Sequence, residues 1–168
     1  ETESIAFLIF KNDSLCYEEY WDGYGKDSYS NSFSMAKSYI GTLIGVALKE
    51  GKVKSLDQPV GDFIPEYSKG ENSKITIRHL LMMSGGLNWD EAYANPFSIT
   101  TEAYYGTDLL NIVRRLKAVE EPGKFFQYKS GDTQILSFVL EQATGKKVSK
   151  YAEEKLWGPM GAVHDALW

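Results

Sequence analysis

The sequence predicts an α+β fold: a β-hairpin from an incomplete antiparallel sheet, followed by a mainly helical region. Two short β-prone stretches surround a turn near the start of the chain, and apolar residues then recur at helical spacing in several longer segments. No internal repeat or low-complexity stretch interrupts this pattern. With 168 residues, 43% of them hydrophobic, the chain is expected to form a single domain over residues 1–168.

The hairpin is predicted first. Residues 5–10 are apolar and β-prone, residues 11–14 have turn chemistry, and residues 15–21 alternate well enough to form the returning strand. A two-stranded sheet alone is marginally stable in water, so we expect these strands to belong to a larger sheet. Residues 22–33 are rich in Gly, Ser, Tyr and Asp and are predicted to form a loop.

A helix is predicted next, over residues 34–49. Ser34 is its predicted N-cap and Gly51 its predicted stop. Gly41 and Gly45 lie one turn apart inside it, and because glycine costs about 1 kcal/mol in a helix interior, we expect another backbone to pack closely there. The apolar positions that form its inner face are Ile40, Leu43, Ile44, Ala47 and Leu48.

Ser34 and Lys37, at the start of this helix, are a candidate pair for nucleophilic catalysis. Their three-residue spacing places both side chains on one face, one turn apart. A serine hydroxyl is a weak nucleophile at neutral pH, so it needs a base within hydrogen-bond reach and donors for the oxyanion. A Ser-x-x-Lys tetrapeptide alone carries little weight, because a chain with this many serines and lysines contains such matches by chance.

The rest of the chain is predicted to be helical, with long connections. Residues 55–66 form a compact connection with two prolines, and residues 87–106 carry many aromatic residues without a regular period, which is typical of a functional lid. Thr76 and Thr107 are the predicted caps of the two helices that follow these segments. The four further helices are expected at residues 77–83, 107–117, 131–144 and 148–157. On the third of them, the expected inner-face residues are Ile135, Phe138, Val139 and Ala143.

Composition and charge exclude several classes of function. The net charge of -5, with no basic stripe, argues against a nucleic-acid partner, and no run approaches the roughly 20 apolar residues of a membrane span. Cys16 is the single cysteine, which excludes an internal disulfide framework. No spacing of His, Cys or carboxylates suggests a metal, and no glycine-rich loop suggests a phosphate-bearing cofactor, so none is expected. His79 is expected to be structural, and His164 completes no catalytic triad.

Several blocks resemble one known superfamily. Ser34-Met35-Ala36-Lys37 resembles the Ser-x-x-Lys motif of the serine β-lactamase and penicillin-binding-protein superfamily. Within it, the pattern is similar to class C β-lactamase-related esterases and amidases, and residues 88–93 are similar to the aminohexanoate-oligomer hydrolases. The resemblance implies a partial β-lactamase/DD-peptidase-like fold. Four further blocks support it in the expected order: residues 50–60, 77–87, 122–130 and 151–161.

The resemblance implies a serine hydrolase that acts on an amide or ester through an acyl-enzyme. Ser34 would be the nucleophile, with Lys37 and Tyr128 as acid and base, and Ser130 and Tyr93 would contact the substrate. Ser130 stands where relatives often have Asn. Two decoy Tyr-x-Asn sequences begin at Tyr29 and Tyr93, but only Tyr128 follows a Pro-Gly turn and precedes a long helix.

Relatives also carry a third motif on an edge strand, together with most of the sheet, after the region that these blocks span. Because residues 1–168 lack it, we expect them alone to have little or no activity. Two alternatives stay open: a penicillin-binding or sensor-type module that binds or acylates without turnover, and a structural fragment with a vestigial motif. The expected partner is a small-molecule or peptide amide or ester, and its identity and the oligomeric state stay unknown. The resemblance favours the periplasm or cell envelope, with the cytoplasm left open.

Overall fold

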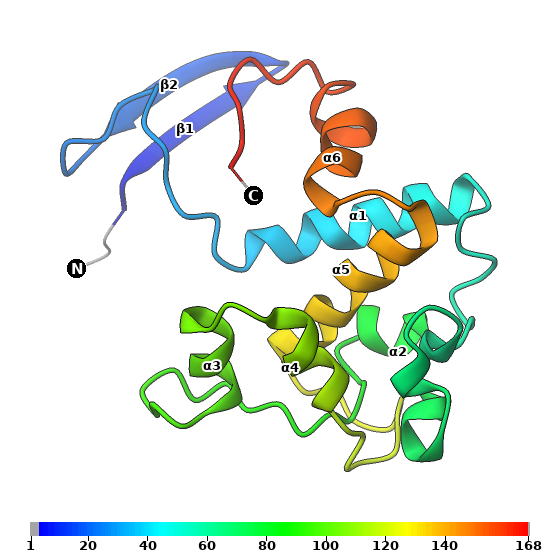
Figure 1. The fold of residues 1–168 in the computed structure, drawn as a ribbon. Coiled ribbons are helices and arrows are strands. Elements are labelled where there is room, and N and C mark those ends of the chain that lie inside the picture. Colours follow the sequence, from blue (N-terminus) through cyan, green and yellow to red (C-terminus); the bar gives the residue numbers. More distant parts are fainter. Residues whose placement is uncertain (1–3, 168) are drawn as a thin grey trace. The chain divides into compact units, whose positions relative to one another are not determined.

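The computed structural model describes residues 4–167 and confirms the predicted α+β fold. The chain divides into two compact units, one made of residues up to Phe33 with Val163–Leu167, the other of Ser34–Ala162. Figure 1 shows both strands in the first unit and the helices in the second. The elements are β1 (Ala6–Lys11), β2 (Ser14–Tyr20), α1 (Met35–Lys49), three 3₁₀ turns (Val60–Asp62, Pro65–Tyr67, Gly70–Lys74), α2 (Ile77–Leu81), α3 (Ile99–Tyr105), α4 (Leu109–Arg115), α5 (Ser130–Thr144), α6 (Val148–Ala152) and a π-helical turn (Glu153–Trp157).

The hairpin of β1 and β2 is closed by a two-residue turn. Asn12 and Asp13 both have positive φ, 49° and 60°, which is the pattern of a type I′ turn and suits the twist of the two strands. The pairing shifts by one residue after Ile9, leaving Cys16 as an extra residue on β2. Side chains on both faces of the hairpin are exposed, including Phe7 and Phe10.

Helix α1 packs against α5, the helix that it crosses in Figure 1. Four residues of its predicted apolar face are buried, and the fifth, Leu48, is only partly buried. Gly51 follows it with φ 71°, the left-handed conformation that a helix-terminating glycine supplies. The expectation of a close backbone at Gly41 and Gly45 is wrong. A side chain at Gly41 would meet only Leu81 Cδ2, at 3.8 Å, and one at Gly45 would meet no described atom within 4 Å.

Helix α2 begins where the sequence predicts and ends two residues earlier. The Thr76 hydroxyl accepts the His79 backbone N–H, and His79 Nδ1 accepts the Thr76 N–H, each at 3.3 Å, so the two residues form a reciprocal capping box. This arrangement explains His79 as a structural residue. Ile77 and Leu80 are fully buried, and α2 packs against α5.

Two expectations for the middle of the chain need correction. The segment 87–106 is not irregular throughout, because α3 forms at its end with Ser98 as N-cap. The helix after it is capped by Asp108, which accepts the Asn111 N–H at 3.0 Å, and not by Thr107. Sequence periodicity missed α3 because this helix has only seven residues and the one that it buries fully, Thr100, is polar.

Helix α5 is the centre of the helical unit, where α1, α2, α4 and α6 all contact it. Ile135 and Val139 are buried as predicted, but Phe138 and Ala143 are only partly buried, and Leu136 and Leu140 take the inner positions. The core that these helices enclose contains Ile40, Leu43, Ile44, Ala47, Val53, Val60, Ile64, Tyr67, Ile75, Ile77, Leu80, Leu87, Trp89, Ile112, Val113, Leu116, Ile135, Leu136, Val139, Leu140, Val148 and Tyr151.

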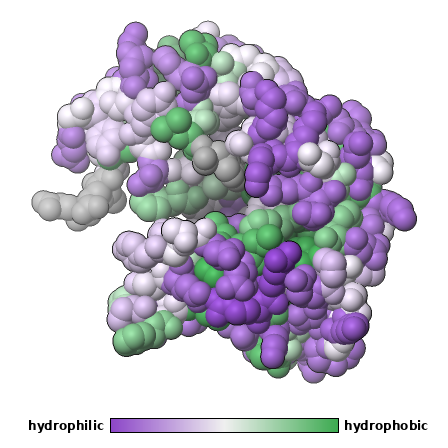
Figure 2. Space-filling view, viewed as in Figure 1, coloured by the Kyte–Doolittle hydropathy of each residue, from purple (hydrophilic) through white to green (hydrophobic). Residues whose placement is uncertain are grey.

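The surface in view in Figure 2 is mostly hydrophilic, with apolar side chains gathered in smaller patches. Within residues 4–167, no helix combines the length and the hydropathy that crossing a bilayer requires.

Candidate active site

Ser34 and Tyr128 are brought together by the structure although they lie 94 residues apart. Ser34 occupies the N-cap position of α1, but its side chain accepts no helix N–H. Its Oγ lies 2.6 Å from the Tyr128 hydroxyl instead. The backbone N–H groups of the first helical turn lack intrahelical acceptors, so the positive end of the helix dipole lies beside this hydroxyl.

Lys37 lies one turn along α1 and completes the group. Its Nζ donates to Ser34 Oγ at 3.4 Å and lies 5.1 Å from the centre of the Tyr128 ring. The three-residue spacing seen in the sequence therefore produces the expected side-by-side placement. The serine is exposed and the lysine half-buried, so a substrate can reach the hydroxyl from solvent.

The electrostatics of the group favour the charged form of Tyr128. Burial alone raises the pKa of this phenol, but hydrogen bonds from Ser34 and Lys37, together with the Lys37 charge, outweigh burial. The net effect lowers the pKa of Tyr128 below its ordinary value of 10.0. A lowered pKa makes the phenolate of Tyr128 easier to form, and that phenolate, 2.6 Å from the serine hydroxyl, can accept the serine proton.

A ladder of backbone contacts holds the loop that carries Tyr128. The segment 83–88, which we call the 83–88 strut, accepts N–H groups from residues 117–127. Three of its backbone carbonyls and one side-chain oxygen are the acceptors. Met83 and Gly86 have positive φ, 52° and 68°, and the carbonyls of both accept N–H groups from residues 117–127. The bonds run from Gln127 N to Met83 O (2.8 Å), Gly123 N to Ser84 O (2.8 Å), Val119 N and Glu120 N to Gly86 O (2.9 and 3.1 Å), and Lys117 N to Asn88 Oδ1 (2.8 Å).

Asp132, in the first turn of α5, forms a further hydrogen bond to the 83–88 strut. Its side chain is fully buried and its Oδ2 accepts the Gly85 N–H at 3.1 Å, whereas Oδ1 has no partner among the described residues. Burial raises the pKa of Asp132 to about 7, against the opposing effects of the Gly85 hydrogen bond and the Lys129 charge. Sequence reasoning missed this carboxylate, because an acidic residue in a first helical turn is ordinarily exposed.

Ser130 and Tyr93 meet at a third residue that sequence reasoning also missed, Glu91. Tyr93 donates its hydroxyl to Glu91 Oε2 at 2.6 Å, and Ser130 donates its backbone N–H to Oε1 and its hydroxyl to Oε2 at 3.3 Å. Glu91 could have been noticed in the sequence, since it lies inside residues 88–93, which resemble the aminohexanoate-oligomer hydrolases. Its contact with Ser130 could not, because the two residues are 39 positions apart and no local sequence pattern predicts that they meet.

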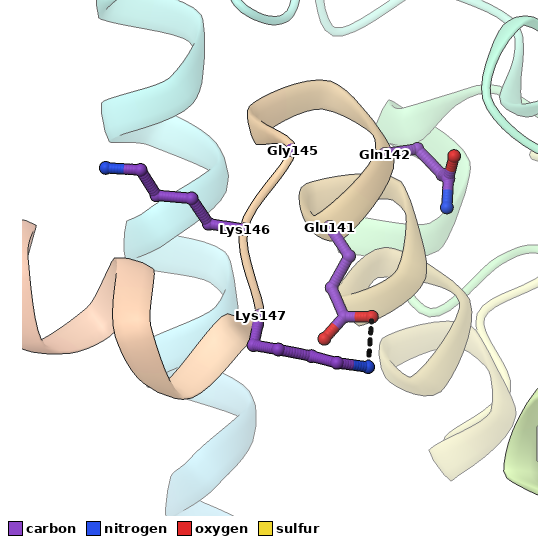
Figure 3. A pocket seen from close by; sticks show the side chains of 5 residues that line it. All are labelled: Glu141, Gln142, Gly145, Lys146 and Lys147. Atoms are coloured by element: carbon purple, nitrogen blue, oxygen red, sulfur yellow. Dashed lines mark ion pairs between the residues drawn. The ribbon is translucent and has the colours of Figure 1, made fainter.

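A separate hollow of about 340 Å³ lies at the other end of α5, lined by Glu141, Gln142, Gly145, Lys146 and Lys147 (Figure 3). Lys147 pairs with Glu141 at 3.6 Å, and Lys146 pairs with Glu154. Because carboxylates of the same chain already neutralise both lysines, the hollow offers little to an anion. The structure places His164 in the other unit, where it pairs with Asp27 at 3.6 Å.

Comparison with known proteins points to one family. The family model described as Beta-lactamase matches residues 1–168. The 6-aminohexanoate-dimer hydrolase of Paenarthrobacter ureafaciens is 27% identical over 177 residues, which cover 99% of this chain and 45% of that protein. The chain thus spans less than half of the length of this curated relative.

Solved structures show the same fold. A penicillin binding protein from Bacillus halodurans matches with a TM-score of 0.71 at 18% identity, over 93% of this chain and 51% of that one. A D-stereospecific amidohydrolase from Streptomyces sp. matches with a TM-score of 0.68 at 20% identity, over 86% of this chain and 46% of that one. At these identities the likeness shows the fold alone.

Proposed function

The chain belongs to the beta-lactamase family, and from this premise we propose that it carries the nucleophile-bearing part of a serine hydrolase that cleaves an amide or ester. One observation carries the proposal: the Ser34 hydroxyl lies 2.6 Å from the Tyr128 hydroxyl and 3.4 Å from Lys37 Nζ. A nucleophile, a proton acceptor and a cation are therefore within reach of one another, which is the arrangement that nucleophilic catalysis needs.

In the proposed reaction, Ser34 Oγ attacks the carbonyl carbon of the substrate and transfers its proton to the Tyr128 oxygen. The new C–O bond forms as the carbonyl becomes an oxyanion, beside the positive end of α1. When the bond to the leaving amine or alcohol breaks, Tyr128 returns the proton to that group. Water then attacks the acyl-enzyme by the same route and releases Ser34. Tyr128 must be a phenolate when it accepts each proton, and the nearby Lys37 charge stabilises that form.

An amide is the substrate class that we propose, because a relative is named for a 6-aminohexanoate dimer, whose two units are joined by an amide. Ser130 and Tyr93 are proposed to line the substrate path beside Tyr128. The cell envelope is the proposed location, on family resemblance alone.

We also propose that residues 1–168 are part of one larger domain and have little activity alone. The hairpin leaves apolar side chains exposed on both faces, and two strands rarely form a stable sheet. The third motif of the superfamily would then come from sequence beyond residue 168. Measurable ester turnover by the purified 168-residue chain, lost in Ser34→Ala, would contradict this part of the proposal.

A fluorophosphonate probe tests the proposed nucleophile in the full-length protein. We expect one covalent label on Ser34, located by peptide mass spectrometry, and no label at that peptide in Ser34→Ala. Loss of the label in Tyr128→Phe without loss of folding would support the proton-transfer role. Labelling at another serine would overturn the assignment.

The time course of acylation separates turnover from binding. With a β-lactam or an activated ester, a hydrolase releases the acyl group and regenerates Ser34, whereas a penicillin-binding or sensor-type module stays acylated. Turnover with burst kinetics is the result that the proposal expects. A stable adduct after hours would favour the sensor.

A further inference from the structure

Glu91 links the irregular segment 87–98 to the first residue of α5. Its two carboxylate oxygens accept the Ser130 backbone N–H, the Ser130 hydroxyl and the Tyr93 hydroxyl. Ser130 directly follows Tyr128 and Lys129 in the chain. Glu91 therefore holds the backbone at Ser130, two residues after Tyr128, the proposed acid/base.

The start of α5 lacks a cap from its own sequence. The N-cap residue is Lys129, whose side chain makes no capping bond and instead donates from Nζ to the Leu87 carbonyl. The first N–H groups of a helix have no intrahelical acceptors, and a negative charge beside them is stabilising. Glu91 supplies that acceptor and that charge from 39 residues away.

The charge of Glu91 also acts on the titrating phenol of Tyr128. Burial is the largest influence on the pKa of Tyr128, and two charged groups act on it besides: Lys37 of α1 lowers the pKa, and Glu91 of the segment 87–98 raises it. Tyr93 is the other titratable group that contacts Glu91, and its own pKa is raised, mainly by their hydrogen bond. Lys37 and Glu91 therefore shift the pKa of Tyr128 in opposite directions.

We propose that Glu91 is a positioning residue of this site: its carboxylate caps α5 through Ser130, fixes the backbone that carries Tyr128, and balances the Lys37 charge. The inference deepens the proposed function and rests on it for the role of Tyr128. It also changes the role of two residues: Ser130 and Tyr93 were expected to contact the substrate, and here they hold the Glu91 carboxylate by hydrogen bonds.

Two substitutions at Glu91 separate its hydrogen bonds from its charge. Glu91→Gln keeps an acceptor for the Ser130 N–H but removes the charge, whereas Glu91→Ala removes both. With an activated ester in the full-length protein, we expect kcat/KM to fall about 10- to 100-fold in Glu91→Ala and less in Glu91→Gln, because a hydrogen bond to a charged group contributes that order. Equal kcat/KM in wild type and Glu91→Ala would overturn the inference.

Ser130→Pro provides a partner for a double-mutant cycle. Ser130 is the first helical residue, where proline is tolerated, and Lys129 has φ -138° and ψ 118°, which suits a residue before proline. The substitution removes the N–H that Glu91 accepts, and Ser130→Ala serves as the reference for loss of the hydroxyl alone. We expect Glu91→Ala and Ser130→Pro to be strongly non-additive in kcat/KM. Additive losses would mean that the two residues do not act through this bond.

The Tyr128 phenol gives a readout that a purely structural role would not move. With ¹³C-labelled tyrosine, assigned by Tyr128→Phe, we expect the pKa of Tyr128 to be lower in Glu91→Gln than in wild type, because the charge that raises it is gone. Asp90→Asn is the matched control, since it removes a neighbouring charge from a residue that contacts Thr100 and not Ser130. An unchanged Tyr128 titration in Glu91→Gln, or the same shift in Asp90→Asn, would overturn the inference.

The titration also distinguishes the two proposals. If wild-type protein shows no Ser34 label and no ester turnover, the proposed function fails, while the Tyr128 titration still tests Glu91. If Ser34 is labelled and turnover occurs, but neither the titration nor kcat/KM responds to Glu91, the proposed function stands and the positioning role fails.

Discussion

At the scale of single residues, Ser34 occupies a helix-capping position but makes no capping hydrogen bond. It stands at the N-cap of α1, where a serine ordinarily accepts a helix N–H, yet its hydroxyl is directed to Tyr128. Departures of this kind from local rules are expected where a residue serves chemistry. The helix starts without that capping bond and relies on the burial of its apolar face.

This departure predicts unequal costs for two similar substitutions. Thr76→Ala removes a capping box from α2 and should lower the free energy of unfolding by about 1 kcal/mol. Ser34→Ala removes no capping bond, so its cost should stay below about 0.5 kcal/mol, although under the proposed function it should abolish acylation. Urea unfolding of both variants checks the difference. Equal costs would mean that Ser34 does stabilise its helix.

Asp132 predicts a pH dependence of stability. Its pKa is raised from 3.8 to about 7, so the folded chain holds a proton that the unfolded chain releases between these values. The stability contributed by the neutral carboxyl is complete below pH 3.8 and declines as pH rises toward 7. Above that, the buried charge costs roughly 4 kcal/mol at most.

Asp132→Asn should remove this dependence, because its side chain cannot ionise and can still accept the Gly85 N–H. We expect the variant to be more stable than wild type above about pH 7 and its stability to change less between about pH 5 and 8. Urea midpoints across that range provide the measurement. Asp165→Asn, at an exposed carboxylate, is the control and should follow wild type. Parallel curves for Asp132→Asn and wild type would show that Asp132 is not buried as described.

At the scale of elements, local signals predicted the structure well and distant contacts were invisible to them. Thr76 and the apolar face of α1 were predictable because a cap and its helix are adjacent in sequence. The cap at Asp108 was missed because Thr107 offers the same chemistry one residue earlier. Glu91 is the clearest case of the limit, since it caps a helix 39 residues away and only the folded backbone reveals the contact.

Two glycines in helices predict effects of opposite sign. A methyl group at Gly131 would lie 2.8 to 3.1 Å from the buried ring of Trp89, so Gly131→Ala should destabilise the chain by roughly 1–3 kcal/mol. Gly45 is exposed in the middle of α1 and has no atom within 4 Å of that position, so Gly45→Ala should stabilise by about 0.5–1 kcal/mol. Thermal unfolding measures both. A loss of stability in Gly45→Ala would indicate a contact that the structure lacks.

At the scale of the whole molecule, the two compact units differ in how much apolar surface they bury. The core lies in the helical unit, whereas both strands of the hairpin are exposed along almost their whole length. Hydrogen exchange should therefore be fast for residues 6–20 of the 168-residue chain and slow for α5. Exchange followed by mass spectrometry tests this expectation. Protection of the hairpin equal to that of α5 would contradict it.

The 83–88 strut has a final consequence, which concerns chain length. Residues 117–127 donate their N–H groups to it in a fixed order, from Lys117 opposite Asn88 to Gln127 opposite Met83. An insertion or deletion of one residue between them would place each later donor opposite the wrong acceptor and carry Tyr128 away from Ser34. The number of residues between Lys117 and Tyr128 is thus constrained by the fixed order of these bonds.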